Sequence, residues 1–326
     1  MSVLENEKDL LVVKDLEIAF TIGGQDVTVV SDVNFEIRQG EVLGLVGESG
    51  CGKSVTAMSL ISLLPSPPSK RKKGEILLDG RDLATLSYSD LLKVRGGEVG
   101  FIFQEPMSSL NPVLTIGFQL VEALRIHRKV SKAEATQQAI SMLQLVGVSG
   151  PELRMKQYAF ELSGGMRQRV MIAMALICSP RLLIADEPTT ALDVTIQAQI
   201  LDLLRSLRKR LGMAILMITH DLGVVAETCD RVIVMYAGRI VESGSVSEVF
   251  TSPKHPYTAA LLKSTPRMAV RQQHLPTIPG IVPAPGERGQ GCAFAARCSR
   301  KLDKCEIERP TLSKEKHSVE CWNPEP

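Results

Sequence analysis

The sequence predicts an α/β fold built on a mixed sheet, and three observations lead to that class. Residues 47–54 read G-E-S-G-C-G-K-S, a glycine-rich loop between an apolar run at 42–46 and a helical pattern at 55–64. A second apolar run, at 182–185, leads directly into two acidic residues, as in a strand that a parallel sheet buries on both faces. Strands and helices alternate beyond this run, whereas the first part of the chain reads mainly as strands. Together these patterns are typical of one α/β domain.

The composition disfavours several classes of protein. The chain has 326 residues, with 38 Lys and Arg against 36 Asp and Glu, so its charge indicates no polyanionic partner such as a nucleic acid. We interpret the basic run at 70–73 as a solvated loop rather than a nucleic-acid or lipid contact. The first fifteen residues carry acids and no apolar stretch of the kind that a secretory signal needs. No apolar run approaches the ~18 residues of a membrane-spanning helix, so we expect a soluble protein, which can still dock on a membrane protein.

The glycine-rich loop has the chemistry of a phosphate-binding site. Its glycines let backbone N–H groups turn inward on a polyphosphate, and the following helix adds the partial positive charge of its N-terminus. Lys53 supplies a full positive charge, and the Ser54 hydroxyl can ligate Mg²⁺. A chance glycine turn is the alternative, but the flanking strand and helix favour the phosphate-binding interpretation.

Other strands are expected on either side of this loop. The expected elements are strands at 10–20, 27–37, 74–80 and 99–103, and a polar loop at 65–73. Two residues near strand ends are candidates for ligand contacts. Phe20 is either a platform for an adenine ring or a core residue, and Gln104 is either a ligand contact or a polar cap.

The apolar period changes to helical spacing between residues 116 and 146, which predicts a helical insertion. The insertion leads to Leu162-Ser163-Gly164-Gly165-Met166, where a serine and two glycines open an apolar helix at 170–177. Ser163 suits a helix N-cap, and the glycines leave the helix end accessible to an anion. A simple capped helix is the alternative to a second anion site.

Acidic and imidazole side chains follow two expected buried strands. Asp186 and Glu187 close the run at 182–185, and ligands gather at the carboxyl ends of such strands. Asp186 is placed to bind Mg²⁺, and Glu187 to hold a water molecule. The elements that follow are a loop at 191–193, a helix at 195–211, a strand at 214–218 and a hairpin of 231–236 and 239–242. His220 would lie on the same sheet edge as the two acids, although a strand-end histidine is usually structural.

The composition shifts near residue 251 to a proline-rich segment, in which only 255–263 reads as helix and no core of its own is evident. The segment ends in four cysteines, Cys292, Cys298, Cys305 and Cys321. Without an export signal, such clustering points to a metal or a metal–sulfur cluster more than to disulfides. The spacing lacks the close cysteine pair of most zinc sites, and four thiolates also suit a [4Fe–4S] cluster. A cluster, zinc and incidental thiols stay open, with a structural role for any metal.

Taken together, the motifs resemble the ATP-binding cassette (ABC) ATPases, the motor subunits of membrane transporters, over residues 9–250. The resemblance rests on the loop at 47–54, Gln104, the signature at 162–166, Asp186-Glu187, Ala191-Leu192-Asp193 and His220. It implies an ABC-type P-loop ATPase domain with a RecA-like core and a helical subdomain at about 112–178. It also implies that two such domains pair head to tail and sandwich two ATP molecules.

The resemblance assigns roles to individual residues. The implied ATP contacts are Phe20, Gly47, Ser49, Gly50, Cys51, Gly52, Lys53, Ser54 and Val55. The implied contacts with the partner's ATP are Ser163, Gly164 and Gly165. The implied Mg²⁺ ligands are Ser54, Gln104 and, through water, Asp186. Glu187 would polarise the attacking water, His220 would contact the γ-phosphate, and Gln104 is the third implied catalytic residue.

The C-terminal part resembles a narrower group. Residues 254–262 (K-H-P-Y-T-A-A-L-L), 278–283 and 101–112 are similar to segments of oligopeptide and dipeptide importer ATPases. The chain looks most like the first of the two nonidentical ATPases of a dipeptide permease. The implied partners are a second, homologous ATPase, two membrane permease subunits and, indirectly, an extracytoplasmic binding protein. The implied location is peripheral, on the cytoplasmic face of the inner membrane. The resemblance also favours a [4Fe–4S] cluster in an extension at 251–326, with its cysteine segment at 292–321.

Other functions compete with this interpretation. Related importers carry nickel, glutathione or opines, so the mechanism is better defined than the solute. A soluble ABC ATPase of translation or DNA repair usually has two cassettes or a long coiled-coil insert, and this chain shows neither. A regulatory protein with an inactive site is disfavoured because Lys53, Asp186, Glu187 and His220 are all present.

Overall fold

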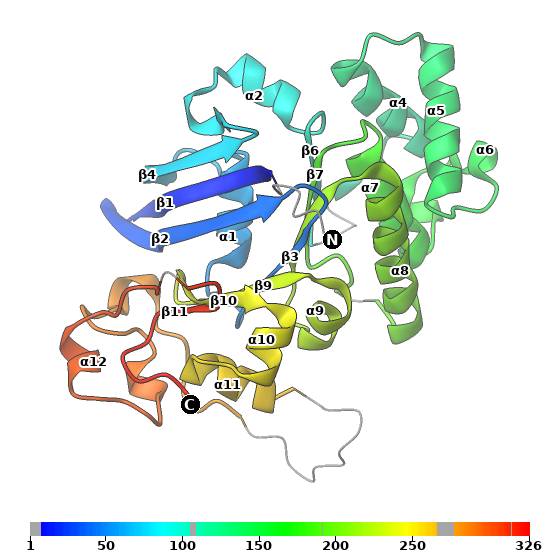
Figure 1. The fold of residues 1–326 in the computed structure, drawn as a ribbon. Helices are drawn as coiled ribbons and strands as arrows, with labels where there is room; N and C mark the ends of the chain where they lie inside the picture. Colours follow the sequence, from blue (N-terminus) through cyan, green and yellow to red (C-terminus); the bar gives the residue numbers. More distant parts are fainter. Residues whose placement is uncertain (1–7, 105–108, 191, 266–276, 314) are drawn as a thin grey trace, which may run out of the picture. The chain divides into compact units, whose positions relative to one another are not determined.

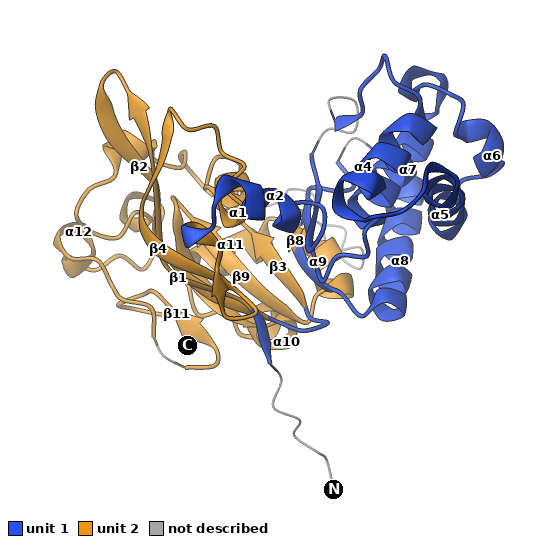
Figure 2. Ribbon diagram, turned by 90° about the horizontal axis from the view of Figure 1, so that it is seen from above, with its two compact units in different colours: residues 1–10, 38–41, 85–216 blue, residues 11–37, 42–84, 217–326 orange. Residues whose placement is uncertain are grey.

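The computed structural model describes residues 8–104, 109–190, 192–265, 277–313 and 315–326 (Figure 1). The chain divides into two compact units, each assembled from separate segments (Figure 2). Unit 1 comprises residues 1–10, 38–41 and 85–216, and unit 2 comprises residues 11–37, 42–84 and 217–326.

A four-stranded sheet in unit 2 has the order β2-β1-β4-β5. Its strands are β1 (Asp9–Ile22), β2 (Gln25–Arg38), β4 (Ser69–Leu78) and β5 (Arg81–Asp82). β1 and β4 run antiparallel, with Leu11 opposite Leu78 and Phe20 opposite Ser69. The strands expected at 10–20 and 27–37 are therefore confirmed.

The expected loop at 65–73 is wrong in its second half. β4 begins at Ser69, so the basic run at 70–73 lies on a strand. Pairing with the long strand β1 explains the difference, because it gives this polar stretch a backbone partner that its own sequence does not reveal. The four basic side chains are nevertheless exposed, and Lys70 Nζ lies 2.9 Å from Asp26 Oδ1.

Unit 2 also contains part of a second sheet, whose strands there have the order β11-β10-β9-β3. These strands are β3 (Val42–Val46), β9 (Arg231–Tyr236), β10 (Arg239–Ser245) and β11 (Ser318–Val319). β3 runs parallel to β9, whereas β10 runs antiparallel to both β9 and β11. This confirms the predicted mixed sheet and the predicted hairpin. The helices of unit 2 are α1 (Lys53–Leu60), α9 (Leu222–Thr228), α10 (Val246–Thr251), α11 (Pro256–Lys263) and α12 (Lys304–Ile307).

Unit 1 contains the parallel pair β6 (Val99–Ile102) and β7 (Leu182–Asp186) together with several helices. The helices are α2 (Tyr88–Val94), α4 (Ile116–His127), α5 (Lys132–Leu145), α6 (Pro151–Arg154), α7 (Gly164–Leu176) and α8 (Val194–Leu211). The predicted helical insertion is confirmed as α4 and α5. Both helices are capped by serine or threonine, since Thr115 Oγ1 accepts from Phe118 N and Ser131 Oγ accepts from Glu134 N.

The strand β8 (Ala214–Ile218) has the predicted bounds and is buried along its whole length. Its first three residues belong to unit 1 and its last two to unit 2. None of the helices in the described residues is long and apolar enough to cross a membrane.

The C-terminal segment, which we define as residues 251–326, contributes to the core of unit 2. The sequence suggested no core in this segment, yet Phe294 is buried and its ring centre lies 5.2 Å from Tyr236 and 5.4 Å from Tyr257. Short one-turn helices, η3 (Pro285–Glu287) and η4 (Ala295–Arg297), accompany it. The segment therefore packs through scattered aromatic residues, which no periodic pattern reveals.

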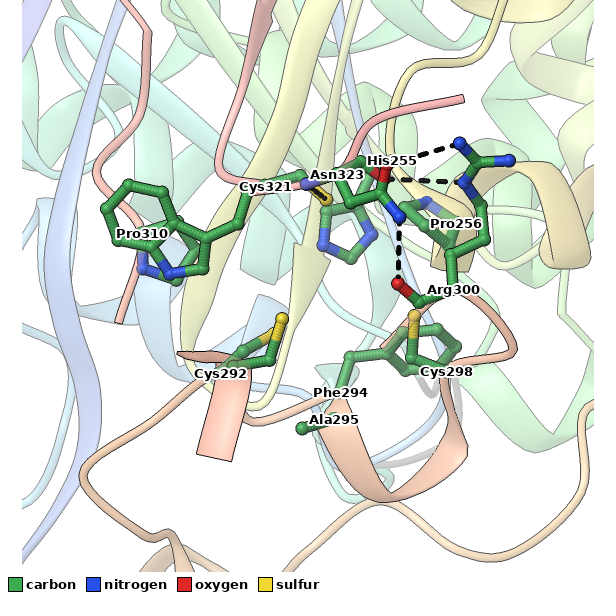
Figure 3. A pocket seen from close by; sticks show the side chains of 12 residues that line it. His255, Pro256, Cys292, Phe294, Ala295, Cys298, Arg300, Pro310, Cys321 and Asn323 are labelled. Carbon is green, nitrogen blue, oxygen red and sulfur yellow. Dashed lines mark hydrogen bonds between the residues drawn. The ribbon is translucent and has the colours of Figure 1, made fainter. Parts of the chain in front are cut away.

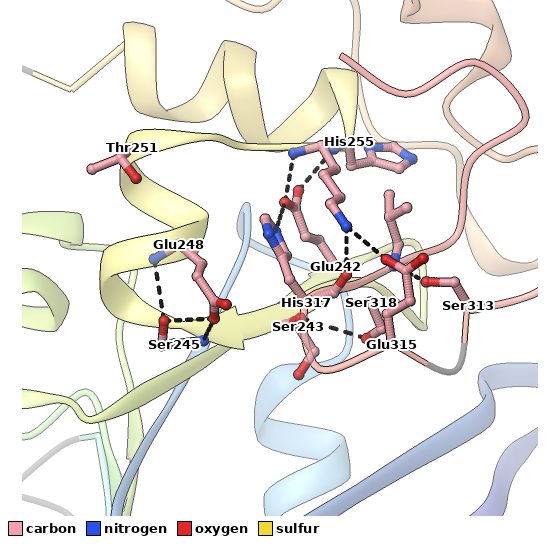
Figure 4. Close-up of polar contacts among 12 residues, drawn as sticks. Glu242, Ser243, Ser245, Glu248, Thr251, His255, Ser313, Glu315, His317 and Ser318 are labelled. Carbon is pink, nitrogen blue, oxygen red and sulfur yellow. Dashed lines mark hydrogen bonds and ion pairs between the residues drawn. The ribbon is translucent and has the colours of Figure 1, made fainter. Parts of the chain in front are cut away.

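A buried carboxylate fixes this segment to the edge of the sheet (Figure 4). Glu242 on β10 is fully buried. It accepts hydrogen bonds from Lys254 N at 2.6 Å and from His255 N at 2.8 Å. His317 Nε2 lies 2.7 Å from the same carboxylate, next to the strand β11. These contacts satisfy a group that is costly to bury alone.

Candidate functional site

The phosphate loop lies in unit 2 between β3 and α1, in the predicted strand–loop–helix order. Gly47 opens it with φ +153°, and a side chain there would collide with the backbone carbonyl of Met235. Gly52 is the N-cap of α1 with φ +107°. The helix spans Lys53–Leu60 rather than the expected 55–64. It ends early because Ser62 adopts a left-handed conformation, and Leu63 N bonds back to Met58 O.

Lys53 is held inside the curve of the loop. It is 7% exposed, and its ammonium donates to Gly47 O at 2.8 Å and to Glu48 O at 3.0 Å. Ser54 is half-buried in the first turn of α1, next to Lys53. The loop thus combines a fixed cation, a helix N-terminus and a hydroxyl, which is the combination that a polyphosphate and its cation need.

Phe20 and His220 belong to the same unit as the phosphate loop. Phe20 is half-buried near the end of β1. His220 is exposed just beyond β8. Thr219 N donates to Leu45 O at 3.3 Å, so the chain that carries His220 leaves the sheet beside the strand that enters the phosphate loop. Asp221 then caps α9, because its Oδ1 accepts from Gly223 N at 2.8 Å.

Gln104 and the two acids lie together in unit 1. Asp186 is the last residue of β7 and is 5% exposed. Glu187 follows with φ +48°, a left-handed conformation that costs a non-glycine residue of order 1 kcal/mol. Its Oε2 accepts from Gln104 Nε2 at 3.1 Å and from Thr190 Oγ1 at 2.7 Å. The contact with Gln104 follows from the pairing of β6 with β7, which ends with Ile102 opposite Ala185.

The signature loop opens α7, also in unit 1. Ser163 is the N-cap, and its Oγ accepts from Met166 N at 3.4 Å. The helix begins at Gly164, six positions earlier than the expected 170, because this cap permits helical backbone through both glycines. The cleft at this helix end is lined by Ser163, Gly164, Gly165, Met166, Arg169, Leu192, Asp193 and Ile196. The structure thereby brings the two loops at 162–166 and 192–193 to one surface.

Sequence reasoning missed Gln168. This residue is 2% exposed on α7, and its Nε2 donates to the carbonyl oxygen of Pro188. It therefore ties the signature helix to the loop that follows Glu187. The only available signal was a glutamine at the start of an apolar helix, which by itself does not indicate a partner.

Three of the predicted placements stay predictions. Residues 105–108 of the extended Gln104 segment lie outside the described residues, as does Ala191. His220 belongs to unit 2, whereas Asp186 and Glu187 belong to unit 1, so the shared sheet edge expected for them is untested.

The four C-terminal cysteines line one pocket, together with His255 and Trp322 (Figure 3). Burial raises the pKa of the Cys292 thiol to about 11, and it also raises the pKa values of Cys298 and Cys321. Asn323 N donates to Cys321 Sγ at 3.4 Å. Among the residues that the structure describes, however, no three Cys, His, Asp or Glu side chains are grouped so that they could hold a metal ion. The donor set is that of a four-thiolate site, without the grouped geometry of one.

Comparisons with known proteins identify the family of this chain. The sequence pattern of the ABC transporter family matches residues 30–190, and that of the oligopeptide/dipeptide transporter C-terminal region matches residues 241–305. The chain is 56% identical to Probable peptide ABC transporter ATP-binding protein y4tR of Sinorhizobium fredii, over 96% of this chain and 94% of that protein. It is 51% identical to Oligopeptide transport ATP-binding protein OppD of Bacillus subtilis, over 96% of this chain and 88% of that protein.

The fold also matches solved structures. Two dimeric structures of the ABC transporter cassette MJ0796, one of them a post-hydrolysis state bound to ADP and Pi, have a TM-score of 0.65 and 28% identity. Each comparison covers 72% of this chain and 98% of the other. The chain belongs to the ATP-binding subunits of ABC transporters, in the group that carries the oligopeptide/dipeptide C-terminal region. As such a subunit it hydrolyses ATP, and the resemblance seen in the sequence is confirmed.

Proposed function

We propose that the protein powers the import of dipeptides or oligopeptides across a membrane. The observation that carries this proposal is the match of residues 241–305 to the oligopeptide/dipeptide transporter C-terminal region. The names of the relatives y4tR and OppD point to the same class of solute. No observation favours nickel, glutathione or an opine instead.

The proposed assembly contains a second, homologous ATPase and two membrane permease subunits, supplied by an extracytoplasmic binding protein. The chain would sit peripherally on the cytoplasmic face of the membrane. The dimeric state of the MJ0796 cassette supports the pairing of two ATPases. The accessible cleft at Ser163 supports it too, because an open helix N-terminus offers N–H groups to an anion from outside the chain. We also propose two domains: an ATPase domain at 9–250, with a helical subdomain at about 112–178, and the C-terminal segment at 251–326.

The residue roles follow the chemistry of phosphoryl transfer, in which positioning and charge stabilisation do most of the work. Lys53 and the loop amides would bind the β- and γ-phosphates, and Phe20 would stack on the adenine. Glu187 would orient the attacking water, with Gln104 already within hydrogen-bond distance of its carboxylate. His220 would contact the γ-phosphate. The signature residues Ser163, Gly164 and Gly165 would bind the γ-phosphate of the partner's ATP.

Mg²⁺ is the cation that suits the proposed ligands by their chemistry. Ser54, Gln104 and Asp186 offer a hydroxyl, an amide and a carboxylate oxygen, which are the hard ligands that Mg²⁺ prefers. When bound, the ion would neutralise charge on the phosphates. The chain's own contribution is to hold Lys53 in the loop through the Gly47 and Glu48 carbonyls.

The cysteine pocket is proposed to hold a [4Fe–4S] cluster through Cys292, Cys298, Cys305 and Cys321. Support comes from four thiols that line one pocket and from the backbone N–H that reaches Cys321. The cluster would stabilise the C-terminal segment. The test is anaerobic purification of the full chain, with measurement of iron, sulfide and visible absorbance. Four iron atoms per chain are expected, and their loss in Cys305→Ser. Colourless, iron-free protein would contradict the proposed cluster. Stoichiometric zinc in that protein would instead identify the pocket as a zinc site.

Transport is tested with the complete transporter in liposomes. Uptake of a labelled dipeptide or oligopeptide should require ATP and should stop when Lys53 is replaced by Met in this chain. Nickel, glutathione and an opine are assayed in parallel. ATP-driven uptake of one of these, without uptake of any peptide, would contradict the proposed solute while leaving the ATPase assignment intact.

A further inference from the structure

The C-terminal segment contacts the phosphate loop at Glu48. The guanidinium of Arg297 makes two parallel bonds to this carboxylate, Nη1 to Oε2 at 2.8 Å and Nη2 to Oε1 at 3.0 Å. The backbone N–H of Glu48 donates to the hydroxyl oxygen of Tyr257 at 2.8 Å. Both the side chain and the backbone of one loop residue are therefore held from outside the loop, by residues of the same unit.

Arg297 is itself fixed in place. Its side chain is 5% exposed, and its Nε donates to Pro279 O at 2.8 Å. The guanidinium lies 5.7 Å from the ring centre of Tyr236 and 5.9 Å from that of Phe294. A bidentate arginine in an apolar, hydrogen-bonded setting is a rigid partner for a carboxylate.

Tyr257 is equally constrained. It is fully buried on α11, and its ring centre lies 4.6 Å from Tyr236. His255 caps this helix, since its Nδ1 accepts from Tyr257 N at 3.0 Å. The hydroxyl that receives the Glu48 N–H is thus carried by a packed helix rather than by a loose side chain.

These contacts offset the negative charge that Glu48 brings to the phosphate loop. Glu48 adds a negative charge between Gly47 and Lys53, where a polyphosphate is to bind, and like charges so close repel each other. Arg297 neutralises that carboxylate and keeps it on the side of the C-terminal segment. Tyr257 fixes the backbone of the same residue, next to the Gly47 and Glu48 carbonyls that hold the Lys53 ammonium.

We propose that Arg297 and Tyr257 are positioning residues for ATP, which set the conformation of the phosphate loop and cancel the charge of Glu48. The proposal rests on the ATP-binding role proposed for Lys53 and its loop. It gives the C-terminal segment a part in nucleotide affinity, in addition to any metal that its cysteines hold.

The test measures Mg-ATP affinity and melting temperature of the full chain. Arg297→Met should weaken ATP binding about tenfold, the size expected when a charge-assisted contact is lost. Glu48→Gln should bind ATP nearly as wild type does. The double variant should bind close to Glu48→Gln, because the unneutralised charge is then absent. Arg309→Met is the matched control. Arg309 donates to the carbonyls of Gly289 and Gly291 rather than to Glu48, so its loss should leave affinity unchanged.

Several outcomes would overturn the proposal. Wild-type affinity in a folded Arg297→Met protein would do so, and so would a double variant as weak as Arg297→Met alone. If Arg297→Met does not fold, Arg297→Lys carries the test, since it keeps the charge and loses the paired geometry. It should weaken binding severalfold, and unchanged affinity would contradict the proposal. A wild-type chain that binds no Mg-ATP would instead refute the proposed ATP role of the loop.

Discussion

Single buried polar side chains fix the conformation of several loops in this ATPase through hydrogen bonds. Lys53 bonds to carbonyls of its own loop, Gln168 holds the carbonyl of Pro188, and Arg297 holds Glu48. Each of these hydrogen bonds joins one of the loops to a buried side chain. Leaving a buried polar group without its hydrogen bond costs free energy of unfolding. The geometry of the loops therefore depends partly on residues outside them, such as Gln168 and Arg297.

Gln168→Leu should destabilise the protein by about 1–3 kcal/mol, because the carbonyl of Pro188 is left without its donor in a buried place. It should also lower ATP turnover, since that carbonyl lies next to Glu187. Chemical denaturation and a steady-state ATPase assay measure the two effects. Gln137→Leu on α5 is the control, because Gln137 is exposed. Equal stability of the two variants would show that the Gln168 contact does not matter.

Sequence patterns predicted the loops but not the hydrogen bonds that hold them to distant parts of the chain. The phosphate loop, the signature serine and the Asp186-Glu187 pair each carry a local signature, so each was found from neighbouring residues. Arg297 lies 249 positions from Glu48, and Gln168 lies 20 from Pro188. No local pattern encodes such a contact, because it depends on how distant segments pack.

Buried strands were the most predictable elements. β3, β8 and β9 have the predicted bounds, because strands buried on both faces are continuous apolar runs between polar ends. The start of β4, the helices α2 and α9, and the strand β11 were missed. These are short or polar elements whose structure comes from a partner strand or a capping residue rather than from periodicity.

The helix α11 gives a prediction on pH. His255 is buried, and burial lowers its pKa from 6.5 to about 3. Its Nδ1 must stay unprotonated to accept from Tyr257 N. Since the folded-state pKa is depressed, the unfolded chain alone takes up a proton as pH falls below 6.5. The stability that this site contributes is thus complete above that pH and falls by about 1.4 kcal/mol for each pH unit below it.

His255→Asn isolates this effect, because asparagine can keep a side-chain acceptor at the helix N-cap but does not titrate. We expect the unfolding free energy of wild type to drop by about 2 kcal/mol more than that of the variant between pH 7 and pH 5. Thermal or denaturant unfolding across that range measures the difference. Parallel stability curves would mean that His255 is not held neutral.

Across the whole molecule, the predicted site residues belong to two different compact units. Phe20, Lys53 and His220 belong to unit 2, whereas Gln104, Ser163, Asp186 and Glu187 belong to unit 1. The family and the ATPase activity could be predicted from the order of the motifs along the chain. The pairing of subunits could not be derived from one chain, because its signature cleft is completed by another molecule's nucleotide in the proposed assembly.

Ser163→Glu tests that assembly. A carboxylate at the open helix end should repel the partner's γ-phosphate and lower ATP hydrolysis by the complete transporter at least tenfold. The isolated variant should still bind Mg-ATP as wild type does, since its own phosphate loop is unchanged. Lys53→Met serves as the comparison, because this variant should lose Mg-ATP binding even in the isolated chain. Normal hydrolysis by the transporter with Ser163→Glu would contradict head-to-tail pairing at this loop.

This chain hydrolyses ATP, and Glu187 is the residue proposed to orient the attacking water. The direct measurement is ATP turnover, and the nucleotide retained, in the purified transporter carrying Glu187→Gln. Removal of a catalytic base costs about 10²–10⁴-fold in rate, so turnover at this chain's ATP should be abolished, with ATP rather than ADP trapped there. Glu152→Gln, an exposed glutamate on α6, should behave as wild type. Unchanged hydrolysis by Glu187→Gln would contradict the proposed role of Glu187 in orienting water.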